Sequence, residues 1–190
     1  MFNVFAAFDI ETSTIWRSGE NTDAHSFLYI WSMQIEDYLI RGRSWDEWVE
    51  CLSVLRGAMD RYGKEQKLDK CPNMIIWVHN LAYEFTIISG FYPFQDDECF
   101  FRDVRKPIYC RMFDAFELRC SYIQSNLSLA ALTKQTGVPV KLSGQKYDYD
   151  KVRFPWTPLS DFELDYTRTD VESLVAAMKV RVHRSGDTLL

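Results

Sequence analysis

Apolar residues in this chain occur mostly in short runs separated by polar segments, a pattern typical of strands. The first run, Phe2 to Ile10, is too short for a typical helix and rich in aromatic side chains, so it predicts a buried central strand. Further runs predict strands at Ser26 to Ile35, Tyr38 to Ile40, Met74 to Val78, Phe100 to Val104, Ile108 to Phe113 and Phe116 to Tyr122. The polar segment Ser13 to Ala24 predicts a surface loop between the first two strands.

Other segments place apolar side chains at helical intervals. Ser44 and Glu47 have the spacing of a capping box, which predicts a helix that ends near Gly63. Shorter helices are predicted at Leu81 to Ser89 and at Leu129 to Thr136. Thr157 and Pro158 predict the start of a last helical segment, of one or two helices, that continues to about His183. The irregular segment Val138 to Pro155 predicts a loop, and loops of this kind often carry function.

The composition favours a single domain and does not exclude a nuclease function. The chain has 190 residues, 47% of them hydrophobic, which is enough for a single well-buried domain over residues 1–190. Its net charge of −5 argues against a nucleic-acid binder that depends on a wide basic face. A nuclease is not excluded, because clustered metal-binding carboxylates count heavily in the formal charge. Aromatic residues make up 15% of the chain, and we expect most of them to fill the core while some stack on bases.

The cysteines and the termini give expectations about compartment and length. The five cysteines show neither a C-x-x-C pair nor zinc-type spacing, so we expect reduced, mostly buried thiols. The chain enters a strand-like run at once and has no apolar stretch long enough to span a bilayer. We therefore expect no signal peptide, no membrane contact and a cytoplasmic location, in the host cytoplasm if the protein is phage-encoded. The apolar ending Thr188-Leu189-Leu190 carries no helix cap, which we interpret as a cut through a longer protein.

Four acidic residues carry the candidate chemistry. Asp9 and Glu11 form a D-x-E pair at the end of the first predicted strand, where open α/β sheets place their sites, and strand alternation points both side chains to one face. Glu84 ends the motif His79-Asn80-Leu81-Ala82-Tyr83-Glu84, and Asp170 lies four residues after Tyr166, on the same face of a helix. If the fold brings the four carboxylates together, they form a cage of oxygen ligands suited to Mg²⁺ or Mn²⁺. Each motif alone has a simpler interpretation as surface acids; their joint occurrence favours a metal-dependent phosphodiesterase.

The three clusters resemble the three exonuclease motifs of DEDD-type 3′→5′ exonucleases. More fully, the chain resembles, from Phe8 to about Met178, the N-terminal proofreading domain of protein-primed family B DNA polymerases of phages and linear plasmids. The resemblance implies an α/β, ribonuclease H-like fold with a central mixed β-sheet flanked by helices. It also implies two Mg²⁺ or Mn²⁺ ions and a single-stranded DNA 3′ end as substrate. A monomer is expected, with a polymerase domain and a terminal protein primer as partners.

Residue roles follow from the same resemblance. The metal ligands would be Asp9, Glu11, Glu84 and Asp170, and Tyr166 would orient the attacking water, which places the chain in the DEDDy subgroup. Lys146 matches the family's catalytic lysine best and Lys141 less well, with a solvated loop lysine as an equal alternative. The DNA-contacting positions of the family are matched by Thr12, Trp77, His79, Asn80, Tyr83, Ser128 and Leu129. The alternative interpretation of Trp77 is core packing instead of base stacking. The alternative interpretation of His79 is a structural histidine instead of a DNA contact.

Glu84 departs from the family pattern, because the second motif usually ends in aspartate. A glutamate side chain is one methylene longer and can still reach a metal directly or through water. The extra length changes the geometry of the site and therefore bears on the rate of hydrolysis. No polymerase palm motif occurs in the chain. Two alternatives therefore remain beside a proofreading exonuclease: a DEDDy ribonuclease that trims RNA 3′ ends, and a catalytically weakened domain that binds nucleic acid or protein.

Overall fold

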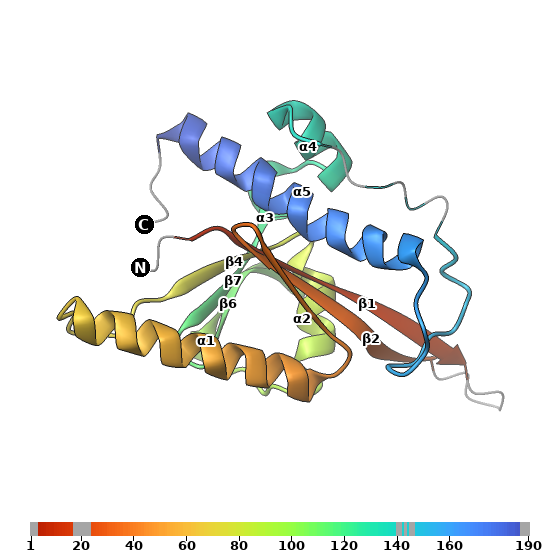
Figure 1. The fold of residues 1–190 in the computed structure, drawn as a ribbon, viewed down its shortest axis with the longest axis horizontal. Helices are drawn as coiled ribbons and strands as arrows, with labels where there is room; N and C mark the ends of the chain where they lie inside the picture. Colours follow the sequence, from red (N-terminus) through yellow and green to blue (C-terminus); the bar gives the residue numbers. More distant parts are fainter. Residues whose placement is uncertain (1–3, 17–23, 140–141, 143, 145–146, 187–190) are drawn as a thin grey trace.

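The computed structural model describes residues 4–16, 24–139, 142, 144 and 147–186. In this part of the chain a seven-stranded sheet lies between two layers of helices (Figure 1). The strands are β1 (Ala6–Trp16), β2 (Ala24–Ile35), β3 (Tyr38–Gly42), β4 (Met74–Val78), β5 (Cys99–Asp103), β6 (Lys106–Met112) and β7 (Phe116–Cys120). The helices are α1 (Trp45–Glu65), α2 (Leu81–Ile88), α3 (Ser121–Ser125), α4 (Leu129–Thr136) and α5 (Asp161–Ser185), and a 3₁₀ turn, η1, covers Asp96–Glu98.

The sheet is mixed, with the spatial order β3-β2-β1-β4-β7-β6-β5. Strand β4 pairs in parallel with β1 and β7, and the remaining neighbours are antiparallel. All five residues of β4 are buried, as expected of a central parallel strand covered on both faces. The predicted α/β fold with a central mixed sheet flanked by helices is therefore confirmed.

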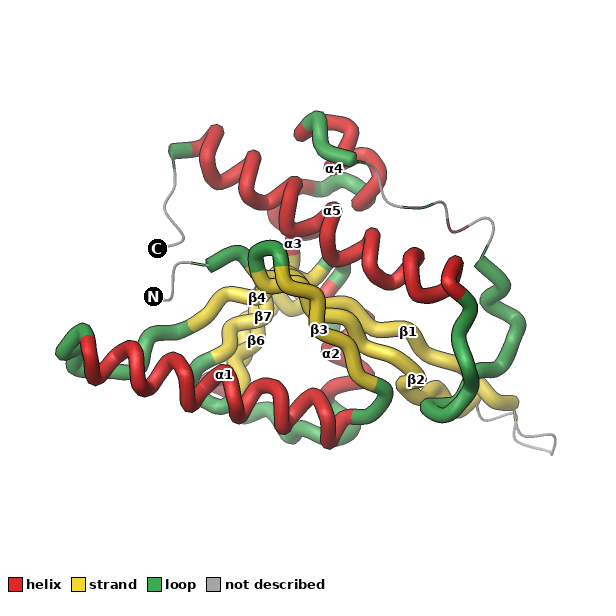
Figure 2. The backbone as a smooth tube through the Cα atoms, viewed as in Figure 1, coloured by secondary structure: helices red, strands yellow, loops and turns green. Residues whose placement is uncertain are grey.

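Two hydrophobic cores hold the layers together, one on each face of the sheet. On the face covered by α1 and α2, the Trp48 ring stacks on Phe8 of β1 with a centroid distance of 4.6 Å. On the other face, α4 and α5 lie over the sheet (Figure 2). Leu132 of α4 and Val171 of α5 pack there against Ala7 and other strand residues. All five cysteines are free thiols, two of them buried and three half-buried. Within the described residues, no helix is long and apolar enough to cross a membrane.

The start of α1 follows the predicted capping box. The Ser44 hydroxyl accepts a hydrogen bond from the Glu47 backbone N–H at 3.2 Å, and the Glu47 carboxylate accepts one from the Ser44 N–H at 3.0 Å. Two of the N–H groups that a helix end leaves open are thus satisfied.

The structure corrects several predicted boundaries. The strand predicted at Phe116 to Tyr122 ends at Cys120, because Ser121 and Tyr122 begin α3. Strand β1 runs to Trp16, so the predicted loop is wrong over its first residues, because Ser13 to Trp16 pair with the start of β2. The last helix is a single one that begins at Asp161 instead of Thr157, because Ser160 and Glu163 form a capping box there. Local sequence patterns predict that these elements exist. Where each one ends depends on the helix cap that forms and on the strand that it pairs with.

Candidate metal centre

Strand β1 and helix α5 carry the candidate ligands. Asp9 and Glu11 follow Ala7 at alternate positions on β1, so all three side chains face the α4 and α5 side of the sheet. A register shift against β2 comes directly after Glu11, and such bulges often lie beside active sites, where they re-aim side chains. Asp170 comes from the middle of α5, the helix that packs over β1.

The fold brings three of the four predicted carboxylates together. Asp9, Glu11 and Asp170 each have a carboxylate oxygen, and these oxygens all lie within 4.8 Å of one another. Asp170 is buried and the other two are half-buried. Like charges this close repel each other, and a divalent cation among them would offset that repulsion.

Glu84, the fourth predicted ligand, is not part of this group; it lies in the first turn of α2, where the charge of Glu11 acts on it. Its side chain is 3% exposed, and its Oε2 atom has no hydrogen-bond partner among the described residues. Burial raises the pKa of this carboxyl, and the negative charge of Glu11 raises it further, against the opposing effect of its own backbone N–H. An unsatisfied buried oxygen next to an acidic cluster suits a hard cation such as Mg²⁺ or Mn²⁺, so the residues fit the predicted metal.

Tyr166 lies one helical turn before Asp170 on α5 and is 3% exposed. Its hydroxyl shares a hydrogen bond with the Tyr149 hydroxyl at 2.8 Å. Burial, this hydrogen bond and the charge of Asp170 all raise the Tyr166 pKa. The phenol therefore stays neutral and can donate one proton in a hydrogen bond.

A set of residues around Tyr166 was missed by the sequence analysis. The Tyr147 ring lies 4.4 Å from the Tyr166 ring, and the Tyr29 and Tyr147 hydroxyls are hydrogen-bonded to each other. The guanidinium of Arg153 lies 4.8 Å from the centre of the Tyr147 ring. Tyr147 and Arg153 fall in the segment that was predicted only as an irregular loop, and nothing in their spacing indicated this packing.

The predicted DNA-contacting residues lie in different surroundings. The Thr12 and Tyr83 hydroxyls are hydrogen-bonded to each other, and both residues line a cavity of about 650 Å³ between β1, α2 and residues 149–152. Asn80 is exposed before α2, with a left-handed φ of 67°. His79 is half-buried, and its Nδ1 lies 3.0 Å from the Ser121 hydroxyl.

The remaining predicted contacts lie in the core, at the exposed N-cap of α4 or outside the described residues. Trp77 is 4% exposed and packs in the core beneath α4 and α5. Ser128 caps α4, where its hydroxyl accepts a hydrogen bond from the Ala131 N–H at 3.3 Å, and Leu129 is buried in the same core. Lys146 and Lys141 lie outside the described part of the chain.

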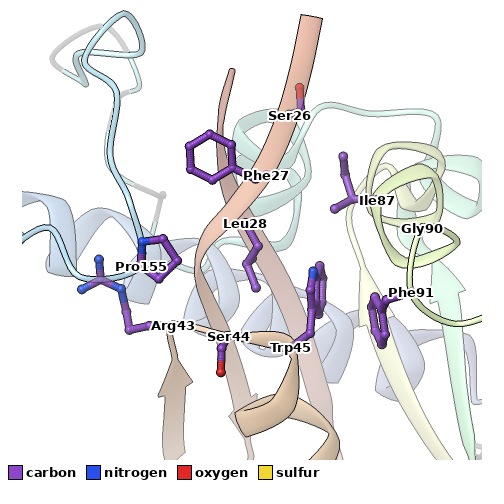
Figure 3. Close-up of a pocket in the computed structure, with 10 residues that line it drawn as sticks. All are labelled: Ser26, Phe27, Leu28, Arg43, Ser44, Trp45, Ile87, Gly90, Phe91 and Pro155. Carbon is purple, nitrogen blue, oxygen red and sulfur yellow. The ribbon is translucent and has the colours of Figure 1, made fainter. Parts of the chain in front are cut away.

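A separate apolar cavity of about 410 Å³ lies between β2, the start of α1 and the end of α2 (Figure 3). Trp45 and Phe91 stack along one side of it with ring centroids 4.4 Å apart. Arg43 at its edge donates hydrogen bonds to the carbonyl oxygens of Phe154 and Thr157, at 3.1 and 2.9 Å. Its guanidinium therefore fastens the segment before α5 to β3, and it belongs to the scaffold of the site.

No protein-family model and no curated protein matches this sequence. Among solved structures, the chain is similar to phi29 DNA polymerase in complex with primer-template DNA and incoming nucleotides, with a TM-score of 0.71 and 12% identity. It is also similar to phi29 DNA polymerase in complex with single-stranded DNA, with a TM-score of 0.69 and 13% identity. The matches cover 98% and 97% of this chain but only 32% of the polymerase in each case. The chain therefore shares its α/β fold, a central mixed sheet flanked by helices, with a stretch of about one third of phi29 DNA polymerase.

Proposed function

We propose that this chain is a metal-dependent 3′→5′ exonuclease that removes nucleotides from single-stranded DNA 3′ ends, as the proofreading module of a DNA polymerase. The observation that carries the proposal is the convergence of Asp9, Glu11 and Asp170, whose oxygens lie within 4.8 Å of one another. The fold shared with a DNA polymerase supports DNA as the substrate.

We assign different roles to the carboxylates and the tyrosine of the site. Asp9, Glu11 and Asp170 would hold Mg²⁺ or Mn²⁺, with Glu84 Oε2 as the fourth ligand. Such ions, when bound, lower the pKa of water and offset charge on the phosphate. Tyr166 would hold the attacking water by a hydrogen bond at its hydroxyl, which burial keeps protonated.

The cavity between β1, α2 and residues 149–152 suits the last nucleotide of a strand. Its volume is about 650 Å³, and it is lined by the hydroxyls of Thr12 and Tyr83 and by Lys151. Tyr83 is 43% exposed, so its ring is accessible for stacking on a base. His79 and Asn80, at the end of β4, would contact the same strand, as would Ser128 at the start of α4.

The wider assignment rests on the same fold. The proposal also includes a polymerase domain in a longer chain and a terminal protein primer as partners. It includes action as a monomer in the host cytoplasm and a catalytic role for Lys146. The chain matches about a third of the length of the polymerase.

The decisive experiment incubates the protein with Mg²⁺ and 5′-labelled single-stranded DNA or RNA of one sequence. We expect a ladder of products shortened from the 3′ end of DNA, abolished by EDTA and by Asp9→Ala combined with Glu11→Ala. Asp165→Ala, which changes an exposed carboxylate on α5, is the matched control and should leave the rate unchanged. Unaltered degradation by the double variant would place the activity elsewhere, and a marked preference for RNA would support the ribonuclease alternative.

A second candidate function is a catalytically weakened domain that binds nucleic acid. Glu84 favours it, because burial raises the pKa of this carboxyl and a protonated carboxyl is a poor metal ligand. Calorimetric titration with Mn²⁺ separates the two. Binding of Mn²⁺ together with DNA cleavage supports the exonuclease, whereas DNA binding without either supports the weakened domain.

A further inference from the structure

A row of aromatic and arginine side chains crosses the half of the sheet that lies away from the metal centre. Strand register pairs Phe100 with Tyr109, Tyr109 with Arg119, and Arg119 with Trp77. Directly paired residues on neighbouring strands point to the same face, so the four side chains form one line from β5 to β4. We call Phe100, Tyr109, Arg119 and Trp77 the aromatic–arginine row.

The helices cover only one end of this row. Trp77 is 4% exposed beneath α4 and α5, whereas the Arg119 side chain is 31% exposed and Phe100 is 55% exposed. A cavity of about 510 Å³ is lined by three members of the row, Trp77, Tyr109 and Arg119, and by Gln124 of α3. This volume is within the range of roughly 300 to 1,000 Å³ that is usual for small-molecule sites.

The exposed end of the row offers stacked rings. Phe100 and Tyr109 have ring centroids 5.9 Å apart and an interplanar angle of 26°. An exposed ring that is already stacked on one side presents a flat, fixed surface, and such surfaces bind nucleobases in a sequence-tolerant way.

Two cations stand beside these rings and are held by one buried acid. Glu117 is 7% exposed; it accepts a hydrogen bond from Arg119 Nε, and its Oε2 lies 3.7 Å from an Nη2 of Arg111. A guanidinium has five N–H donors, so each arginine is oriented by Glu117 and keeps further donors for another anion. The group carries a net charge of +1 in a chain with a net charge of −5, which gives this face local complementarity to phosphate.

We propose that the aromatic–arginine row, with Arg111, is a second binding surface for single-stranded nucleic acid, distinct from the metal centre. A base would stack on the Phe100 and Tyr109 rings while adjacent phosphates pair with Arg111 and Arg119. Trp77 is paired with Ala7, so the row lies on the same sheet face as Asp9 and Glu11. Binding at the row needs no metal and no cleavage, so the inference goes beyond the proposed function.

Fluorescence anisotropy with a labelled, 3′-blocked oligothymidylate in EDTA tests this surface without cleavage. Phe100→Ala should weaken binding about tenfold, because the stacking of one base on an aromatic ring contributes about that much to the affinity. The triple variant Arg111→Gln, Glu117→Gln, Arg119→Gln removes the charges but keeps hydrogen-bonding side chains. It should reduce the slope of log K against log salt by about 1 to 2. Arg61→Gln is the matched control, because it removes the same net charge from an exposed position on α1, against the other face.

Cross-linking locates the bound strand. An oligonucleotide with 5-iodouracil should cross-link under ultraviolet light to the peptide that contains Tyr109, in the wild type and in Asp9→Ala with Glu11→Ala alike. Persistence in this double variant separates the inference from the fate of the proposed nuclease. Two results would overturn the inference. One is that Phe100→Ala and the triple variant bind with the same affinity as Arg61→Gln. The other is that the cross-links are confined to the cavity near Thr12 and Tyr83. Equal competition by a polyglutamate peptide would also overturn it, since the row would then recognise charge alone.

Discussion

The Arg153 guanidinium and the Glu163 carboxylate form a buried ion pair, with Nε and Oε1 2.5 Å apart and side chains only 3% and 6% exposed. Arg153 also donates to the carbonyl oxygens of Asp148 and Lys151, both at 2.7 Å, and its backbone N–H donates to the Ser13 hydroxyl at 2.8 Å. One residue thus ties the segment before α5 to β1 and to the first turn of α5, the two elements that carry the candidate metal ligands.

Loss of the Arg153 side chain should destabilise the protein strongly. We expect Arg153→Leu to lower the free energy of unfolding by about 3 to 5 kcal/mol, because it removes the buried cation and leaves Glu163 only the half-exposed Lys151, at 3.4 Å. Arg168→Leu is the control, because it breaks ion pairs at a side chain that is 41% exposed and should cost less than about 1 kcal/mol. Urea unfolding at pH 7 measures both values, and similar losses for the two variants would contradict the role given to Arg153.

The same ion pair predicts an acid-sensitive fold. Burial alone would raise the Glu163 pKa, but hydrogen bonds from the Ser160 N–H, the Arg153 guanidinium and the Ser160 hydroxyl outweigh it and lower the pKa to about 2. Because the unfolded chain titrates near 4.5, this stabilisation is complete above that pH and is lost as pH falls towards 2.

Urea unfolding of wild type and Glu163→Gln between pH 6 and 2.5 checks this expectation. The difference between the two proteins should shrink as pH falls below 4.5, by up to about 1.4 kcal/mol per pH unit. A difference that stays constant over this range would show that Glu163 does not titrate as described.

Tyr166→Phe should slow DNA cleavage without affecting metal binding. The variant keeps the ring but loses the hydroxyl that would orient the attacking water, so we expect turnover to fall about 100-fold. Single-turnover kinetics gives the rate, and Mn²⁺ titration gives the affinity, which should stay unchanged. Tyr38→Phe, which alters a residue that is 76% exposed, is the control. Weaker Mn²⁺ binding by Tyr166→Phe would assign the hydroxyl a structural role instead.

Glu84→Gln should stabilise the metal-free protein at pH 8. Burial raises the Glu84 pKa, so the folded state holds a proton that the unfolded chain releases, and stability falls as pH rises above 4.5. Replacement by the neutral amide removes this loss, which we expect to be about 1 to 3 kcal/mol. In the wild type, Mg²⁺ should raise the melting temperature by binding only the folded state, and the rise should be smaller in Glu84→Gln.

Thermal melts with and without Mg²⁺ test both parts of this expectation. Glu50→Gln, at an exposed position on α1, is the control and should behave as the wild type. Equal metal-dependent shifts in Glu84→Gln and wild type would remove Glu84 from the ligand set.

The Trp31 indole ring packs directly against the backbone of Gly42, at the end of β3. A Cβ at this position would overlap the indole ring of the almost fully buried Trp31. We expect Gly42→Ala to cost about 1 to 3 kcal/mol in unfolding free energy through overpacking. Gly57→Ala, inside α1 with 3.7 Å to the nearest atom, should instead stabilise by about 0.5 to 1 kcal/mol. Urea denaturation of both variants checks the contrast in sign.

Local sequence determined the elements and which residues share a face. Strand alternation placed Asp9 and Glu11 on one side of β1, helical spacing placed Tyr166 and Asp170 on one side of α5, and the capping box at Ser44 started α1. These relations span a few residues, so backbone geometry alone decides them.

Tertiary structure decided the distances and the burial on which the chemistry depends. It brought Asp170 to Asp9 and Glu11, and it buried Glu84 in the first turn of α2. It also joined Arg153 to Ser13 across 140 residues and Tyr147 to Tyr29 across 118. These contacts follow from how helices and strands pack on one sheet, and no short stretch of sequence encodes the depth at which a side chain is buried.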